Sequence, residues 1–138
     1  MSKQDAQLTG MAGEFLTVGK LFKRGLQASV TFGNAKAVDV LAYNPRNDKN
    51  YNVQVKSLRK KNCFFLKKES IHPDHIYMFI VLNDFDMAEE FFIVKGKTIL
   101  DDINHFFGSS YRNKVSSMPA VNYGPLQEYK DNWKVFEE

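Results

Sequence analysis

Residues 37–57 read AVDVLAYNPRNDKNYNVQVKS, and this stretch decides the fold that we predict. It contains two runs, Val38 to Tyr43 and Tyr51 to Lys56, that have the length and the β-branched composition of strands. The residues between them, 44–50, are polar and include a proline, as in turns that join antiparallel neighbours. We therefore predict a β-hairpin over residues 38–56.

This hairpin brings three polar side chains to one place. Side chains alternate along a strand, so Gln54 and Lys56 project to one side while Val53 and Val55 face the core. The start of the first hairpin strand lies beside the end of the second, which places Asp39 next to them. A carboxylate, an amide and an ammonium group are thus predicted to converge at one rim of the sheet.

Other periodic segments surround the hairpin. Residues 4–24 form an amphipathic helix, because apolar residues recur at spacings of three and four and Gly25 ends the pattern. Further strands are predicted at 26–32, 76–82 and 90–94. The run at 76–82 is continuously apolar, as in a buried central strand, so a layered α/β domain is expected.

The C-terminal part adds a helix and an extension. Residues 98–107 are apolar on one side of a helix, and Gly108-Ser109-Ser110 is expected to stop it. Residues 109–138 are expected to form an irregular extension that packs on the core. Four of its apolar residues have the spacing of a last short helix: Leu126, Tyr129, Trp133 and Phe136. No linker or repeat divides the chain, so residues 1–138 are predicted to form one domain.

Composition limits the class of protein. The chain has 138 residues, 43% hydrophobic and 14% aromatic, which suffices for a packed interior. The first residues contain no apolar run of a signal peptide, and the longest apolar stretch is too short to span a bilayer. A single cysteine excludes an internal disulfide and fits a reducing compartment. We therefore expect a cytoplasmic protein.

The charges are unevenly distributed along a chain with a net charge of +3. Two clusters are basic, one late in the first helix and one after the hairpin: Lys20, Lys23, Arg24, and Arg59, Lys60, Lys61. Acids gather at residues 84–90 and 101–102, so we expect separate positive and negative faces. The basic clusters are candidates for phosphate contacts, and the alternative is a solvated surface that keeps the protein soluble.

The segment His72-Pro73-Asp74-His75 places two histidines beside an acid. A structural zinc site would need further ligands nearby, such as cysteines or a third histidine, and the neighbouring sequence offers none. The favoured interpretation is a polar turn that leads into the buried strand at 76–82.

The pattern of Asp39 followed, after a turn, by Gln54-Val55-Lys56 resembles the signature of the PD-(D/E)XK phosphodiesterase superfamily. Its Q-x-K form is similar to that of Mrr-type restriction endonucleases. Glu14 stands where small Holliday-junction-resolvase-like domains carry a glutamate on the first helix. The alternative is that Asp39 merely ends a strand, that Lys56 is a sheet-edge charge and that Glu14 is a solvated helix acid.

The resemblance implies a restriction-endonuclease-like α/β fold, in which a mixed central sheet is flanked by helices in the order α-β-β-β-(short α)-β-β-α. It implies Mg²⁺ (or Mn²⁺) held by Asp39, Glu14, Gln54 and the carbonyl of Val55, with Lys56 acting on the attacking water. DNA would then be the substrate, and a second copy or a targeting protein the partner. Gln54 is neutral and attracts a cation less than a carboxylate, so a catalytically silent DNA- or protein-binding module is the alternative.

Overall fold

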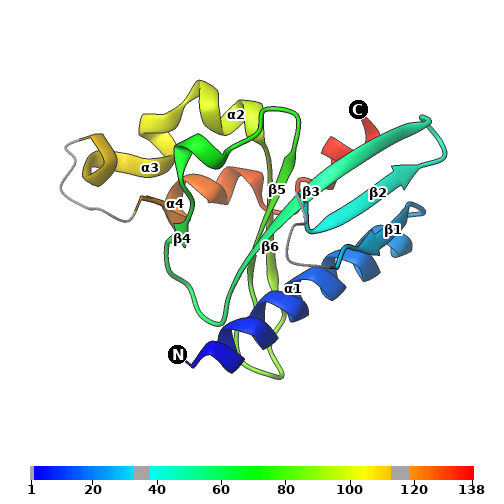
Figure 1. Ribbon diagram of the computed structural model, residues 1–138, viewed down its shortest axis with the longest axis horizontal. Helices are drawn as coiled ribbons and strands as arrows, with labels where there is room; N and C mark the ends of the chain where they lie inside the picture. Colours follow the sequence, from blue (N-terminus) through cyan, green and yellow to red (C-terminus); the bar gives the residue numbers. More distant parts are fainter. Residues whose placement is uncertain (1, 33–37, 113–118) are drawn as a thin grey trace.

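The computed structural model describes residues 2–32, 38–112 and 119–138, and its centre is a mixed five-stranded sheet (Figure 1). The strands lie in the order β1-β2-β3-β5-β6 and span Gln27–Val30, Val40–Asn44, Lys49–Leu58, Ile76–Val81 and Glu90–Lys95. β1, β2 and β3 are antiparallel neighbours, β3 and β5 are parallel, and β5 and β6 are antiparallel. The predicted hairpin and the strands on either side of it are confirmed.

Helices cover both faces of this sheet (Figure 1). On one face lies α1, Lys3–Lys23, which begins at a capping box between Ser2 and Asp5. On the other face lie α2 (Gly96–Asp101), α3 (Ile103–Arg112) and α4 (Tyr123–Leu126). Each face therefore has its own apolar core, and the predicted mixed central sheet flanked by helices is confirmed. No helix among the described residues is long and apolar enough to cross a membrane.

Strand β5 is buried along its whole length, as its sequence predicted. Met78 and Ile80 belong to the core under α1, while Tyr77, Phe79 and Val81 belong to the core under α2, α3 and α4. Two-sided burial explains why this strand lacks the apolar–polar alternation seen in strands with one solvated face.

The connection from β3 to β5 contains almost no helix. It includes the two-residue strand β4, Phe64–Phe65, and one 3₁₀ turn, η1, Lys68–Ser70. β4 pairs with β7, Ala120–Val121, which belongs to the C-terminal part of the chain. The short crossover helix of the predicted order is thus a single turn.

The helix predicted at residues 98–107 is two helices, because the backbone leaves helical geometry at Asp102, between α2 and α3. At Gly108 the backbone leaves helical geometry, with φ 73° and ψ −165°, a conformation that glycine adopts without strain, so the helix is interrupted at the glycine that was predicted to stop it.

The single helix predicted near the C-terminus is also wrong. α4 is followed by two 3₁₀ turns, η2 (Gln127–Tyr129) and η3 (Trp133–Glu137). Asp131 lies between these turns with φ 53°, and its N–H donates to the carbonyl of Phe91 on β6. A bond to the sheet therefore replaces the next helical turn. The apolar side chains still reach the core, since Leu126, Trp133 and Phe136 are buried.

Asn44, at the end of β2, holds the last residues against the hairpin. Its side chain is fully buried and donates from Nδ2 to the carbonyl of Phe136 at 2.8 Å and to Glu137 Oε2 at 3.0 Å. Its Oδ1 accepts from the N–H of Arg46 at 2.9 Å. One amide therefore shapes the β2–β3 turn and anchors the C-terminus.

Replacement of Asn44 by leucine is expected to lower the free energy of unfolding by about 2–3 kcal/mol, because the carbonyl and N–H that it satisfies lose a buried partner. Urea denaturation followed by Trp133 fluorescence measures this loss. Asn50→Leu is the control, since Asn50 is exposed on the same hairpin. Equal stability of the two variants would contradict the anchoring role.

Candidate functional site

Asp39 lies where β2 and β3 separate. The last paired residues of the two strands are Val40 and Val53, and the N–H of Asp39 donates to the Val53 carbonyl at 3.0 Å. Beyond this point the Asp39 carboxylate accepts the N–H of Val55 through Oδ2 at 2.8 Å. The side chain thus occupies the position that a β2 carbonyl would take in a continued ladder. This explains why β2 begins at Val40, whereas the sequence predicted a strand from Val38.

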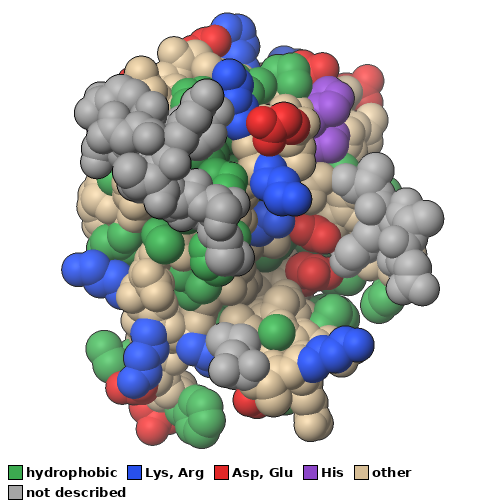
Figure 2. All heavy atoms as spheres, turned by 60° about the vertical axis from the view of Figure 1, so that its left-hand side comes forward, with side chains coloured by type: hydrophobic (Ala, Val, Ile, Leu, Met, Phe, Trp, Pro, Cys, Tyr) green, Lys and Arg blue, Asp and Glu red, His purple; other side chains and the backbone are tan. Residues whose placement is uncertain are grey.

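Gln54 and Lys56 are the residues on either side of Val55. Both are half-buried, and the parallel register pairs them with Tyr77 and Phe79, on the sheet face away from α1. The Asp39 carboxylate is therefore fixed to the backbone between the amide-bearing and the ammonium-bearing residue. Acidic and basic side chains also lie side by side near the middle of the face shown in Figure 2.

The carbonyl of Val55 belongs to the same edge of β3. In a strand the N–H and the C=O of one residue point toward the same neighbouring strand. The Val55 N–H points to Asp39, whereas Gln54 and Lys56 use the opposite edge to pair with β5. The sequence resemblance implied this carbonyl as a metal ligand. The carbonyl points from the edge of β3 that faces Asp39.

Glu14 lies where α1 crosses the same segment of β3. The neighbouring Gly13 is so close to β3 that an added Cβ would stand 1.8 Å from Ser57 Oγ and 3.2 Å from Val55 Cγ1. Glu14 itself is only 8% exposed. The alternative of a solvated helix acid is therefore excluded, and Glu14 is buried where α1 packs on the segment of β3 that carries Val55 and Ser57.

These residues offer oxygen atoms of the kind that Mg²⁺ binds. Asp39 and Glu14 carry carboxylates, Gln54 carries an amide oxygen, and Val55 presents a backbone carbonyl. Mg²⁺ keeps several waters and needs only one or two protein carboxylates. Among the residues that the structure describes, no group of three or more His, Cys, Asp or Glu side chains is placed to hold a metal ion, so a cation here would depend on these carboxylate, amide and backbone oxygens.

His75 is a member of this neighbourhood that sequence reasoning missed. Its Nδ1 lies 3.3 Å from Nε2 of Gln54. Burial lowers the pKa of His75 below its usual value, with His72 acting in the same direction and Asp74 opposing them. The sequence correctly predicted a polar turn here. The contact with Gln54 follows from the parallel pairing of β3 with β5, since His75 directly precedes β5.

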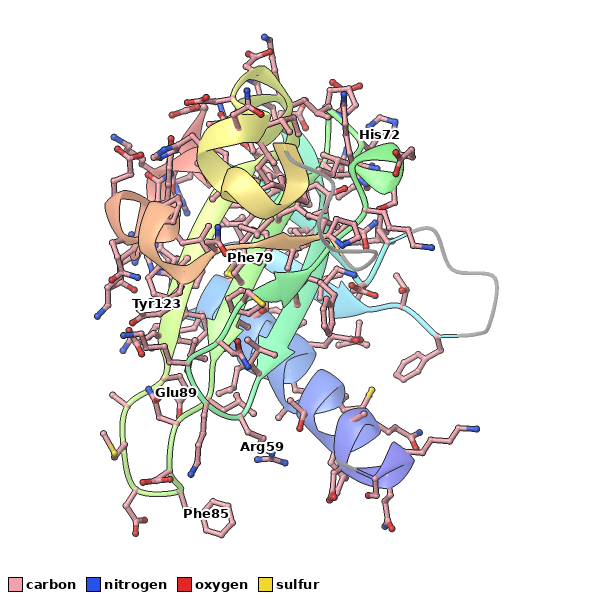
Figure 3. All side chains as sticks on the ribbon, turned by 90° about the vertical axis from the view of Figure 1, so that its left-hand side faces the viewer. Arg59, His72, Phe79, Phe85, Glu89 and Tyr123 are labelled. Atoms are coloured by element: carbon pink, nitrogen blue, oxygen red, sulfur yellow. The ribbon has the colours of Figure 1, made fainter. Side chains whose placement is uncertain are left out.

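The basic residues after β3 share their surroundings with acids. Because β3 and β5 are parallel, their ends emerge together, and Arg59 and Lys60 line a hollow with residues 83–87, which include Asp84 and Asp86. Figure 3 shows Arg59 and Phe85 at this end of the molecule and His72 at the other. The predicted separation of positive and negative faces is therefore wrong at this end.

The two basic clusters do not form one surface. The Lys20 ammonium lies 5.4 Å from the centre of the Phe91 ring, and the Arg24 guanidinium 5.5 Å from that of Trp133. Both rings belong to the core on the α1 face, and Lys23 lies in the last turn of the same helix. Gln54 and Lys56 project from the opposite face of the sheet. The Lys61 ammonium lies over the ring of Tyr123, which packs on the core of that opposite face.

Comparisons with known proteins support the fold. No protein-family model matches the sequence, and no curated protein matches it. A solved bacterial homing endonuclease, I-Ssp6803I, is similar in structure with a TM-score of 0.65 and 12% identity, over 95% of this chain and 91% of that chain.

The Holliday junction resolvase Hjc of Archaeoglobus fulgidus is similar with a TM-score of 0.59 and 12% identity, over 94% of this chain and 96% of the resolvase. This chain therefore shares the fold of DNA endonucleases and resolvases along nearly its whole length. At this level of identity the likeness concerns the fold.

Proposed function

We propose that this chain is a Mg²⁺-dependent endonuclease that hydrolyses phosphodiester bonds in DNA. The observation that carries the proposal is the Asp39 carboxylate, bonded to the Val55 N–H between Gln54 and Lys56. The shared fold with a homing endonuclease and a resolvase supports it. The single cysteine is in keeping with action in the cytoplasm.

In this proposal Asp39 and Glu14 hold the cation, together with the amide oxygen of Gln54 and the carbonyl of Val55. When bound, Mg²⁺ or Mn²⁺ neutralises charge that develops on the phosphate oxygens and lowers the pKa of a bound water. Lys56 projects beside Gln54 and would orient or deprotonate the attacking water. The lysine ammonium also offsets negative charge as a compact point charge.

DNA would approach from the face that bears Lys56. Arg59, Lys60 and Lys61 continue the chain beyond β3, and we assign them phosphate contacts that position the duplex without reading its sequence. Lys20, Lys23 and Arg24 belong to the α1 face and would not touch the same stretch of backbone. A chain of this size leaves little surface for sequence recognition, so a second copy or a targeting protein would direct it.

Replacement of Lys56 by methionine tests the enzymatic proposal, because methionine keeps an unbranched apolar stem and removes the ammonium. With supercoiled plasmid and Mg²⁺ or Mn²⁺, cleavage is expected to fall by about 100-fold or more, the usual contribution of a general acid–base group. DNA binding should persist. Lys49→Met is the matched control, since Lys49 is exposed at the far end of the same strand.

Unchanged cleavage by Lys56→Met would contradict the assigned role and point to a contaminating nuclease. Salt-sensitive DNA binding by the wild-type protein without cleavage in either metal would overturn the endonuclease and favour the silent binding module.

A further inference from the structure

An amide in a metal site has an orientation problem that a carboxylate does not have. The two ends of the Gln54 amide have nearly the same shape, but only the oxygen can bind a cation, while the NH₂ end donates hydrogen bonds. A glutamine at this position is therefore useful only if something fixes which end faces Asp39. This question arises from the proposed function.

His75 meets the Gln54 amide at its nitrogen. The two atoms in contact are Gln54 Nε2 and His75 Nδ1, at 3.3 Å. An amide NH₂ group donates, so in this arrangement His75 Nδ1 is the acceptor. The nitrogen end of the amide is thus assigned to His75, which leaves the oxygen on the other end.

His75 is itself held in place from several sides. Its N–H donates to the His72 carbonyl at 3.1 Å, and its carbonyl accepts from Gly96 at 2.8 Å. Gly96 packs so closely that an added Cβ would stand 2.0 Å from the His72 carbonyl oxygen. The His75 ring is stacked on that of His72 with centroids 4.2 Å apart and 12° between the planes. The acceptor is therefore presented by a rigid turn.

We propose that His75 is a positioning residue, which binds the nitrogen of the Gln54 amide and so directs the amide oxygen toward the cation held by Asp39. The histidine does not touch the reacting atoms. It acts through Gln54, and it explains how a neutral glutamine can serve where a carboxylate would need no such partner. Partners of this kind typically change metal affinity by about 10- to 100-fold.

Two substitutions of His75 separate this role from a packing role. His75→Asn keeps an acceptor near the position of Nδ1, because the asparagine oxygen is equally far along the side chain. His75→Leu fills similar space without an acceptor. Calorimetric titration with Mn²⁺ in the absence of DNA should show affinity within about threefold of wild type for His75→Asn and a 10- to 100-fold loss for His75→Leu.

The matched control is His105→Asn, which makes the same change on α3, where the ring contacts Glu128 and not the proposed site. It should bind Mn²⁺ as wild type does. The side-chain ¹⁵N resonance of Gln54 gives a second readout without metal, and it should move in His75→Leu and stay nearly in place in His75→Asn.

A second-site change completes the test. The two carboxylate oxygens of glutamate are equivalent, so a glutamate at position 54 needs no neighbouring residue to orient it. Gln54→Glu in the His75→Leu background should therefore recover the lost Mn²⁺ affinity. A merely structural role of His75 would not be repaired in this way.

The outcomes distinguish the inference from the function on which it rests. Equal Mn²⁺ affinity of His75→Leu and wild type would overturn the positioning role and leave the endonuclease proposal standing. A His75→Asn variant as weak as His75→Leu would also overturn it. Absence of any Mn²⁺ or Mg²⁺ binding by the wild-type protein would overturn both proposals.

Discussion

Replacement of Asp39 by asparagine is expected to abolish metal-dependent cleavage while leaving the fold intact. The asparagine oxygen can still accept the Val55 N–H, so the bond that closes the β2–β3 rim survives. What disappears is one of the two carboxylates assigned to the cation. Cleavage should fall by about 1,000-fold, which corresponds to about 4 kcal/mol of transition-state stabilisation.

Three measurements check this result. Plasmid cleavage and Mn²⁺ binding, the latter measured by titration, should both be lost in Asp39→Asn. The free energy of unfolding of this variant should stay within about 1 kcal/mol of wild type. Asp39→Ala should lose cleavage and also about 1–3 kcal/mol of stability, because the Val55 N–H then lacks its acceptor.

Asp48→Asn is the matched control for the Asp39 variant, since it makes the same chemical change in the β2–β3 turn. Asp48 has φ 58°, a conformation that asparagine tolerates. It should cleave and bind Mn²⁺ as wild type does. Cleavage by Asp39→Asn at the wild-type rate would contradict the assignment of Asp39 to the proposed site.

The parts of the fold that sequence predicts well are those set by neighbours in the chain. The β2–β3 hairpin follows from two strand runs and one polar turn, so its register needs no distant information. The end of the chain is different, since Asp131 leaves helical geometry to bond Phe91, a residue far away in sequence. Helical spacing in the tail cannot reveal a bond to the sheet.

The candidate site divides in the same way. Alternation along β3 predicts that Gln54 and Lys56 share a face, and the register places them so. The contact of His75 with Gln54 depends on the parallel pairing of β3 and β5, which a long connection separates in sequence. The mixing of Arg59 with Asp84 and Asp86 has the same origin, because parallel strands bring their ends together.

The close contact between α1 and β3 leads to the second prediction with a large effect, a loss of stability when Gly13 is replaced by alanine. Gly13 has no room for a side chain: a Cβ would stand 1.8 Å from Ser57 Oγ and 3.0 Å from Ser57 Cβ. Gly13→Ala is therefore expected to lower the free energy of unfolding by about 3 kcal/mol, as overpacking does, although alanine favours the helix by about 1 kcal/mol. Urea denaturation measures the loss.

Gly10→Ala is the matched control on the same helix, because a Cβ at Gly10 has no heavy atom within 4 Å among the described residues. It should stabilise the protein by about 0.5–1 kcal/mol, since alanine is the better helix former. A comparable loss from both alanines would mean that α1 does not press on β3 at Gly13.

Ser57 provides the compensating change. Its Oγ is buried and has no hydrogen-bond partner among the residues that the structure describes, so Ser57→Ala alone should be neutral or stabilise by up to about 1 kcal/mol. In the double variant with Gly13→Ala the closest clash is gone, and the two substitutions should show a favourable coupling of at least about 1 kcal/mol. Additive effects would contradict the close approach.

The same pair of variants links packing to the proposed chemistry. Glu14 follows Gly13 and is buried where α1 meets the strand that carries Lys56. An alanine that pushes α1 away from β3 should therefore weaken Mn²⁺ binding as well as stability, and Ser57→Ala should restore both together. Restored stability without restored Mn²⁺ affinity would show that Glu14 does not depend on this contact, and would leave Asp39 as the carboxylate that holds the cation.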